Sequence, residues 1–367
     1  MLMKNSQQHH NSLGFFNRIR GLGVIWIIIG HSFAQYMTTK TAAEAAAIPV
    51  FAGAGRVLGG GILAMFFLIS GFYFYRRSPK KCFSTQKKLI LRPYIMTSMA
   101  IILVKALISV IAGRFSWKNT VSYIVTYALG LNVTDGRQVL GITLKTISIF
   151  WFLLALFGGW VLYNAIVHLK DKRMQTVAVV SCVVCSWILT KIFRTWPFAL
   201  PAVLLAVGYI AAGHYIHQKN LLERKLPKWM WCVISSFALI SIVFGYSDIA
   251  SGVWKLGLLD VAGSFCVGFL LLRLYAYLTA RCGNSCVLQV VEKIGLYSMW
   301  ILCLHAFEKE VINWKRLLTV LPGRMLLCGI ICFVGRCVVI YLLYIGFSRI
   351  RMLYHSKRRK KITFTEE

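Results

Sequence analysis

The sequence predicts an all-α integral membrane protein with about ten transmembrane helices, both termini in the cytoplasm and one outer re-entrant or interfacial segment. Two properties of the 367 residues support this: 58% are hydrophobic and only 14% are charged, with a mean hydropathy of +0.68. Soluble domains carry about 45–50% apolar and about 25% charged residues. The composition therefore excludes an ordinary soluble globular protein, and it is too apolar for a disordered chain.

The third observation is the length of the apolar runs, because a helix needs about 20 mostly apolar residues to cross a bilayer. Ten segments meet this requirement: 21–37, 57–75, 94–112, 147–167, 174–192, 198–216, 230–246, 256–279, 287–305 and 325–348. An eleventh apolar run, 119–132, has only 14 residues. That length suits a re-entrant or interfacial piece better than a span.

The distribution of cations decides between ten and eleven spans. With the N-terminus inside and ten spans, the inner segments hold 26 of the 42 Lys and Arg residues and the outer segments hold 13. An eleventh span would turn the basic run 357–361 outward, against the positive-inside rule. We therefore expect residues 1–350 to form one membrane-embedded domain, 351–367 to form a basic cytoplasmic tail, and 113–146 to lie outside.

The net charge of +31 is thereby explained by topology, with membrane lipids as expected partners. A nucleic-acid partner is not expected, because the basic tail is short and tethered to the membrane. The eleven cysteines mostly lie inside apolar runs, and the Cys182–Cys185 pair has no second pair beside it. We expect these thiols to act as apolar packing groups, with no metal site and no bound cofactor.

Two ionisable residues in the first span are candidate catalytic residues. Arg20 stands at its inner edge and His31 follows eleven residues later, about 16 Å along the same helix face. Ionisable groups inside a membrane are costly and point to function. The alternative is an arginine that reaches back to the interface and a histidine that is hydrogen-bonded within the bundle.

The basic loop 76–94 follows the second span and contains seven cations and no acidic residue. Lys88 and Arg92 are four residues apart, directly before Pro93, and two cations at that spacing could clamp phosphates. Positive-inside topology and binding of anionic lipids are the alternative explanations. Ser70, in the second span, is expected to allow close helix packing rather than to act as a nucleophile, because no GxSxG elbow surrounds it.

The later spans contain further polar residues. Asp260 in the eighth span could orient His31 or pair with a cation, of which Arg273 is one. His305, at the outer end of the ninth span, could bind an acceptor or lie at the interface. Glu308 and Glu310 are interpreted as solvated outer charges, and Lys105 and Arg336 are given no role.

The ordered set of motifs resembles the acyltransferase-3 family of integral membrane acyltransferases over residues 15–350. It consists of Arg20-x10-His31, the FFxxSG of Phe66–Gly71, Lys88 and Arg92 before Pro93-Tyr94, the Trp151–Leu154 segment, and Ile294–His305. Met299-Trp300 departs from the family pattern, and the acidic residue common after the Trp motif is missing.

The resemblance implies transfer of an acyl group, usually acetyl, from cytoplasmic acyl-CoA to a sugar hydroxyl of a surface glycan or its lipid-linked precursor. It also implies a bacterial inner-membrane location, with a glycan and acyl-CoA as partners. Arg20, Lys88 and Arg92 would hold the donor phosphates, and His31 would act as general base or be transiently acylated. Ser70, Trp151, Asp260 and His305 would support the site or bind the acceptor.

A multi-span transporter or flippase for an anionic or lipid-linked glycan is the alternative function. The enzyme is favoured because a basic cluster and an imidazole share one helix. No inverted repeat or matched pair of broken helices is visible in the sequence, as a transporter often has. The oligomeric state is left open.

Overall fold

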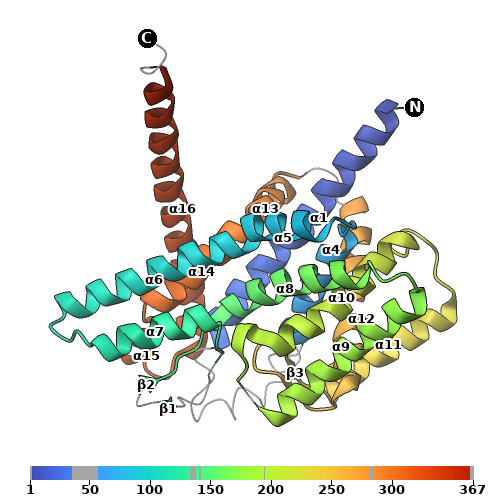
Figure 1. Cartoon of the computed structure of the whole chain (residues 1–367), viewed down its shortest axis with the longest axis horizontal. Coiled ribbons are helices and arrows are strands. Elements are labelled where there is room, and N and C mark those ends of the chain that lie inside the picture. Colours follow the sequence, from blue (N-terminus) through green and yellow to red (C-terminus); the bar gives the residue numbers. More distant parts are fainter. Residues whose placement is uncertain are drawn as a thin grey trace.

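The computed structural model describes residues 2–34, 57–132, 138–139, 142–193, 195–281 and 285–363. These residues are mainly helical, which confirms the all-α class (Figure 1). The N-terminal half contains α1 (Leu2–Ala34), η1 (Val57–Ile62), α4 (Leu63–Phe72), α5 (Pro79–Gln86), η2 (Lys87–Leu91), α6 (Arg92–Ile111), α7 (Trp117–Leu129), η3 (Ser148–Phe150) and α8 (Trp151–Ile166).

The C-terminal half adds further helices and a pair of short strands. They are α9 (Lys172–Ile192), η4 (Pro197–Ala199), α10 (Leu200–Gln218), α11 (Lys228–Val243), β3 (Ser247–Asp248), β4 (Val253–Trp254), α12 (Leu258–Arg281), α13 (Cys286–Leu296), α14 (Ser298–Val311), η5 (Trp314–Arg316), α15 (Leu317–Val320) and α16 (Met325–Thr363). Strands β1 (Gln138–Val139) and β2 (Ile142–Thr143) pair antiparallel, as do β3 and β4.

Six helical stretches in the described residues are long and apolar enough to cross a membrane, and a seventh is the bent pair α13–α14. The chain is therefore a multi-pass membrane protein. Each of the ten predicted spans overlaps helix, but α1 is not among the long apolar helices, and α4 with its flanking residues and α11 are short apolar helices. The predicted first span, 21–37, extends beyond Ala34 and so partly lies outside the described residues. The number of spans stays a prediction.

The predicted basic loop 76–94 is wrong in its secondary structure, because residues 79–111 are continuously helical. Pro79 occupies the first turn of α5, where its missing N–H costs nothing. Pro93 lies in the first turn of α6, directly after the π-helical residues 87–91. The Arg92 N–H closes the π turn on the Lys87 carbonyl, and Pro93, the next residue, has no N–H to donate.

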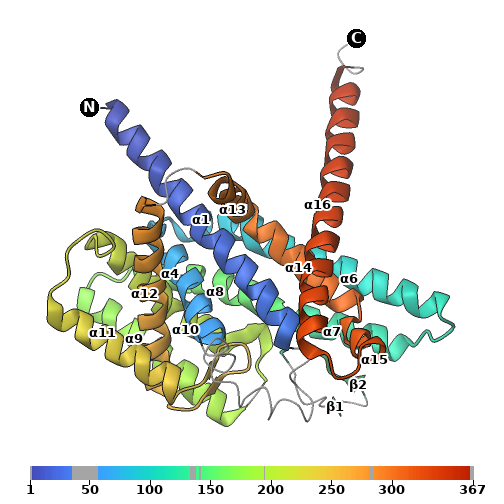
Figure 2. The same cartoon turned by 180° about the vertical axis from the view of Figure 1, so that it is seen from behind.

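Helix α16 continues past residue 351, the predicted start of the tail, to Thr363. Helices α1 and α16 extend from the same side of the molecule, and the β1–β2 and β3–β4 hairpins lie on the opposite side (Figures 1 and 2). This arrangement agrees with two termini on one side of the membrane. The cytoplasmic orientation of that side stays a prediction.

Glycines bring two pairs of helices into backbone contact. A Cβ added at Gly71 would collide with the Ile210 carbonyl, and one at Gly213 with the Leu68 carbonyl, so α4 and α10 pack reciprocally. In the same way α1 packs on α13, where Gly21 lies on the Val291 carbonyl. Small residues allow this close approach of membrane helices.

Candidate active site

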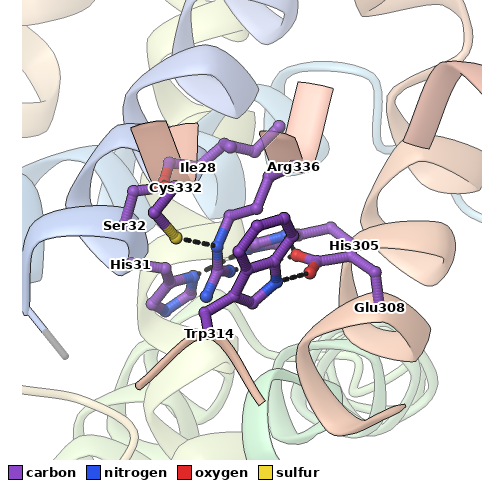
Figure 3. A network of polar contacts seen from close by, with 8 residues as sticks. All are labelled: Ile28, His31, Ser32, His305, Glu308, Trp314, Cys332 and Arg336. Atoms are coloured by element: carbon purple, nitrogen blue, oxygen red, sulfur yellow. Dashed lines mark hydrogen bonds and ion pairs between the residues drawn. The ribbon is translucent and has the colours of Figure 1, made fainter. Parts of the chain in front are cut away.

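A chain of polar contacts joins α1, α14 and α16 inside the bundle (Figure 3). The Nδ1 atom of His31 lies 3.0 Å from Nε2 of His305. On the other side of the ring, His305 Nδ1 lies 2.7 Å from Glu308 Oε1. Arg336 Nη1 donates to the same carboxylate oxygen over 3.1 Å. Two residues that the sequence singled out separately, His31 and His305, are therefore in direct contact.

The inner members of this chain are fully shielded from the surface. His305 is 1% exposed, and Glu308 and Arg336 are 0% exposed. Trp314 Nε1 donates to Glu308 Oε2 over 2.6 Å, and Arg336 Nε lies 3.1 Å from Cys332 Sγ. Both carboxylate oxygens thus have partners, which is the condition for retaining a charged pair in a low-dielectric interior.

Helical spacing in the sequence places these groups. His305 and Glu308 are three residues apart on α14, and Cys332 and Arg336 are four apart on α16, so each pair shares a helix face. The third helix, α1, supplies His31. The neighbouring Ser32 hydroxyl donates to the Ile28 carbonyl over 2.7 Å, so its hydrogen bond stays within its own helix.

The carboxylate fixes the roles of the ring nitrogens. Ionised Glu308 can only accept, so His305 Nδ1 carries the hydrogen that lies between them. The Nε2 atom of neutral His305 is then an acceptor, and His31 Nδ1 must donate to it. His31 Nε2 is left with a lone pair, and within the described residues nothing hydrogen-bonds to that atom. His31 is half-buried, and Nε2 is the ring nitrogen that remains for a further partner.

Arg20 lies on the same continuous helix as His31, as the sequence predicts. Its guanidinium carbon is 5.4 Å from the centre of the Tyr73 ring, beyond the end of α4, a cation–π distance. His31 lies eleven positions after Arg20 on this helix, about 16 Å along its axis.

Lys88 lies on η2 and Arg92 is the first residue of α6, and both side chains are exposed. Among the described residues, no ion pair engages either of them. A role for these two cations and Arg20 in donor binding stays a prediction.

Ser70 and Trp151 pack inside the bundle. The Ser70 hydroxyl accepts a hydrogen bond from Trp160 Nε1 over 2.5 Å, which ties α4 to α8. Trp151 is 5% exposed at the start of α8, in the main apolar core. In the part of the chain that the structure describes, no hydrogen bond or ring contact joins them to His31 or His305.

Asp260 lies in the first turn of α12 and is 0% exposed. Its Oδ2 accepts from the Leu256 backbone N–H over 2.7 Å. Arg273, near the other end of α12, instead donates to the carbonyl oxygens of Leu222 and Arg224. The expected pairing of Asp260 with Arg273, and its contact with His31, are therefore not seen.

The family model described as an acyltransferase domain, that of the acyltransferase-3 family, matches residues 13–345. The chain belongs to the acyltransferase-3 family. No curated protein and no solved structure matches it. Membership supports a membrane acyltransferase over the alternative transporter, and the matched range contains His31, His305, Glu308 and Arg336.

Sequence reasoning missed two members of this acyltransferase's polar chain. Glu308 was predicted to be a solvated charge, which is wrong because α14 continues to Val311 and buries the carboxylate. Arg336 was given no role. Two signals pointed to them: the three-residue spacing from His305 to Glu308, and a single arginine inside the strongly apolar run 325–348.

Proposed function

We propose that this membrane acyltransferase lies in the bacterial cytoplasmic membrane and transfers an acetyl group from cytoplasmic acetyl-CoA to a sugar hydroxyl. The acceptor is a cell-surface polysaccharide or its lipid-linked precursor. One observation carries the proposal: His31 presents an unpartnered Nε2 while its Nδ1 is held by His305, which Glu308 and Arg336 support in turn. An acceptor hydroxyl needs such a base to attack a thioester.

In the reaction, His31 Nε2 takes the proton of the acceptor hydroxyl as its oxygen attacks the thioester carbonyl. The carbon–sulfur bond then breaks, and the proton on His31 passes to the departing CoA sulfur. While His31 is protonated, the neutral ring of His305 accepts from its Nδ1–H, and Glu308 holds the hydrogen on His305 Nδ1. These contacts thus orient the base, as in other base–orienter arrangements.

For the donor, Arg20, Lys88 and Arg92 are proposed to hold the phosphates of CoA. Arg20 stands before the first predicted span, and Lys88 and Arg92 stand before the third. The positive-inside rule places these positions on the cytoplasmic side. The pantetheine arm is long and thin, and it would bring the thioester along α1 to His31. Exposure of Lys88 and Arg92, with no ion pair to described residues, supports their availability to a polyanion.

Transient acylation of His31 is the other route. It would form a bond between the acyl carbon and His31 Nε2, release CoA, and pass the acyl group to the acceptor in a second step. Incubating the protein with radiolabelled acetyl-CoA and no acceptor separates the two. Direct attack leaves the protein unlabelled, whereas label on the wild-type chain that is absent from His31→Ala establishes the acyl-enzyme.

The decisive experiment measures the O-acetyl content of surface polysaccharide in cells with the gene, without it, and with His31→Ala. Acetyl should be lost in the last two, and His217→Ala, which changes an exposed histidine on α10, should retain it. Unchanged acetyl content without the gene would overturn the proposed acceptor, and full activity of His31→Ala would overturn the mechanism.

A further inference from the structure

A cavity of about 340 Å³, lined by both polar and apolar side chains, lies where α6, α7 and the end of α14 meet. Its lining includes Lys105 from α6, Asn119 and Tyr123 from α7, Glu310 from α14, and Lys145 from the segment before α8. The volume is near the lower end of the range for small-ligand sites. No role has been given above to these side chains.

Two ammonium groups in this cavity share one aromatic ring. Lys105 Nζ is 4.5 Å and Lys145 Nζ is 5.1 Å from the centre of the Tyr123 ring. The electron-rich face of the ring attracts both cations. The two positive charges repel each other at this distance, so the binding of an anion beside them is favourable.

Among the described residues, Lys105 has an anionic partner and Lys145 has none. Lys105 Nζ lies 2.9 Å from Glu310 Oε2 and 3.0 Å from the Tyr123 hydroxyl. In the described residues, Lys145 has no carboxylate within ion-pair distance, and the exposed Arg114 at the same cavity has none either. The cavity therefore has an excess of positive charge.

The backbone holds Lys145 in place. Its N–H donates to Thr126 Oγ1 over 3.1 Å, which ties this residue to α7. The Asn119 side chain, also at the cavity, has no hydrogen-bond partner among the described residues, and it offers both a donor and an acceptor. A fixed cation and an amide are the groups that recognise a carboxylate or phosphate beside hydroxyl groups.

The cavity and the chain of polar contacts share helix α14. Glu310 follows His305 by five residues on α14, about 7.5 Å along the helix. Glu308 and Glu310 are two residues apart and so point to nearly opposite sides of α14. One helix thus carries the polar chain on one face and a wall of the cavity on the other.

We infer that this cavity is an acceptor subsite that binds a negatively charged sugar residue, with Lys145 pairing its carboxylate or phosphate. This inference rests on the proposed function, because it makes the cavity part of the glycan site. The same charge could come from a lipid phosphate, so the test separates the two sources.

The test uses the full chain in phosphatidylcholine nanodiscs and two probes, methyl glucuronoside and neutral methyl glucoside. Ligand-induced shifts in melting temperature give the affinities. The wild type should bind the glucuronoside about tenfold or more tightly than the glucoside, which is the effect of one charge-assisted hydrogen bond. Lys145→Gln should lose this preference and Lys145→Arg should retain it.

The matched control is Lys118→Gln, an exposed cation on α7 that does not line the cavity, and it should keep the preference. Equal binding of both sugars by the wild type, or an unchanged preference in Lys145→Gln, would overturn the inference. So would loss of the glucuronoside shift on adding phosphatidylglycerol, because a lipid phosphate would then occupy the cavity. Acetyl transfer from acetyl-CoA is measured separately: its absence in the wild type counts against the proposed function while leaving the binding result intact.

Discussion

The imidazole rings of His31 and His305 lie in hydrogen-bond contact at 3.0 Å although 274 residues separate them in the sequence. The contact links α1 to α14. It places the proposed base at one end of a chain whose other end is the ion pair of Glu308 and Arg336. Each link of the chain can be changed separately.

Replacing His305 by Ala should lower kcat about 10²-fold while leaving the KM for acetyl-CoA unchanged. His305 orients His31 and accepts its Nδ1–H, and a loss of this factor in kcat is the usual size of an acid–base contribution. His31→Ala should lose all transfer, and the double variant should be no worse than His31→Ala alone, since residues that act as a unit are not additive. Additive losses in steady-state assays would show that the two histidines act independently.

Replacing Glu308 by Gln should destabilise the fold by about 3–5 kcal/mol, because it leaves the Arg336 charge buried without its partner. Thermal unfolding in detergent measures the loss. The control is Glu292→Gln: Glu292 pairs with Arg18 but is 34% exposed, so this change should cost about 1 kcal/mol or less. Equal effects of the two substitutions would argue against a charged pair at Glu308.

Replacing Gly213 by Ala should destabilise the protein by about 1–3 kcal/mol, because the new methyl group would press on the Leu68 carbonyl and force α10 away from α4. Gly71→Ala should act in the same direction through the Ile210 carbonyl. Gly346→Ala is the control, since an added Cβ there meets no atom within 4 Å. Melting temperatures in one detergent compare the three, and an unaffected Gly213→Ala would contradict the close packing.

Replacing Arg20 or Arg92 by Ala should raise the KM for acetyl-CoA several-fold and leave the KM for the acceptor unchanged. Each removes one charge-assisted contact to a phosphate. Lys80→Ala, in the same basic stretch, serves as the control for general loss of charge. If acetyl-CoA affinity falls equally in all three variants, the effect is a property of the basic surface and not of a specific clamp.

Cysteines introduced at Ser84 and Asn119, in a chain without its other accessible thiols, should react with a membrane-impermeant reagent from opposite sides. Ser84 should be labelled only from the cytoplasm and Asn119 only from outside. Helix α7 has 13 residues, about 20 Å of rise, which is too short for a bilayer core of about 30 Å. Labelling of Ser84 from outside would reverse the predicted topology.

Sequence alone predicted the class of fold, because composition and run length are properties of the whole chain. It also singled out His31 and His305, since a histidine in an apolar run is conspicuous. Their contact could not be predicted from the sequence, because no rule of local spacing relates residues that are so far apart along the chain. Glu308 was misinterpreted because the end of the ninth span was placed at residue 305, and a helix that extends two turns further converts a solvated charge into a buried one.

The basic segment was misjudged for a different reason. Its helix was not recognised because seven positive charges and two prolines are typical of a loop, whereas Pro79 and Pro93 both lie in the first turn of a helix. The roles of Ser70 and Asp260 depended on neighbours in space, Trp160 and the Leu256 backbone, which spacing in the sequence does not identify.

Because α1 is one continuous helix, the distance from Arg20 to the proposed base His31 is fixed. No break separates Arg20 from His31, so a donor anchored at Arg20 must extend about 16 Å before its thioester reaches the base. A small activated acetyl compound could bind at Arg20 or at His31, but it would be too short to reach both. Donor choice would then depend on the reach of the carrier as much as on the acyl group it bears.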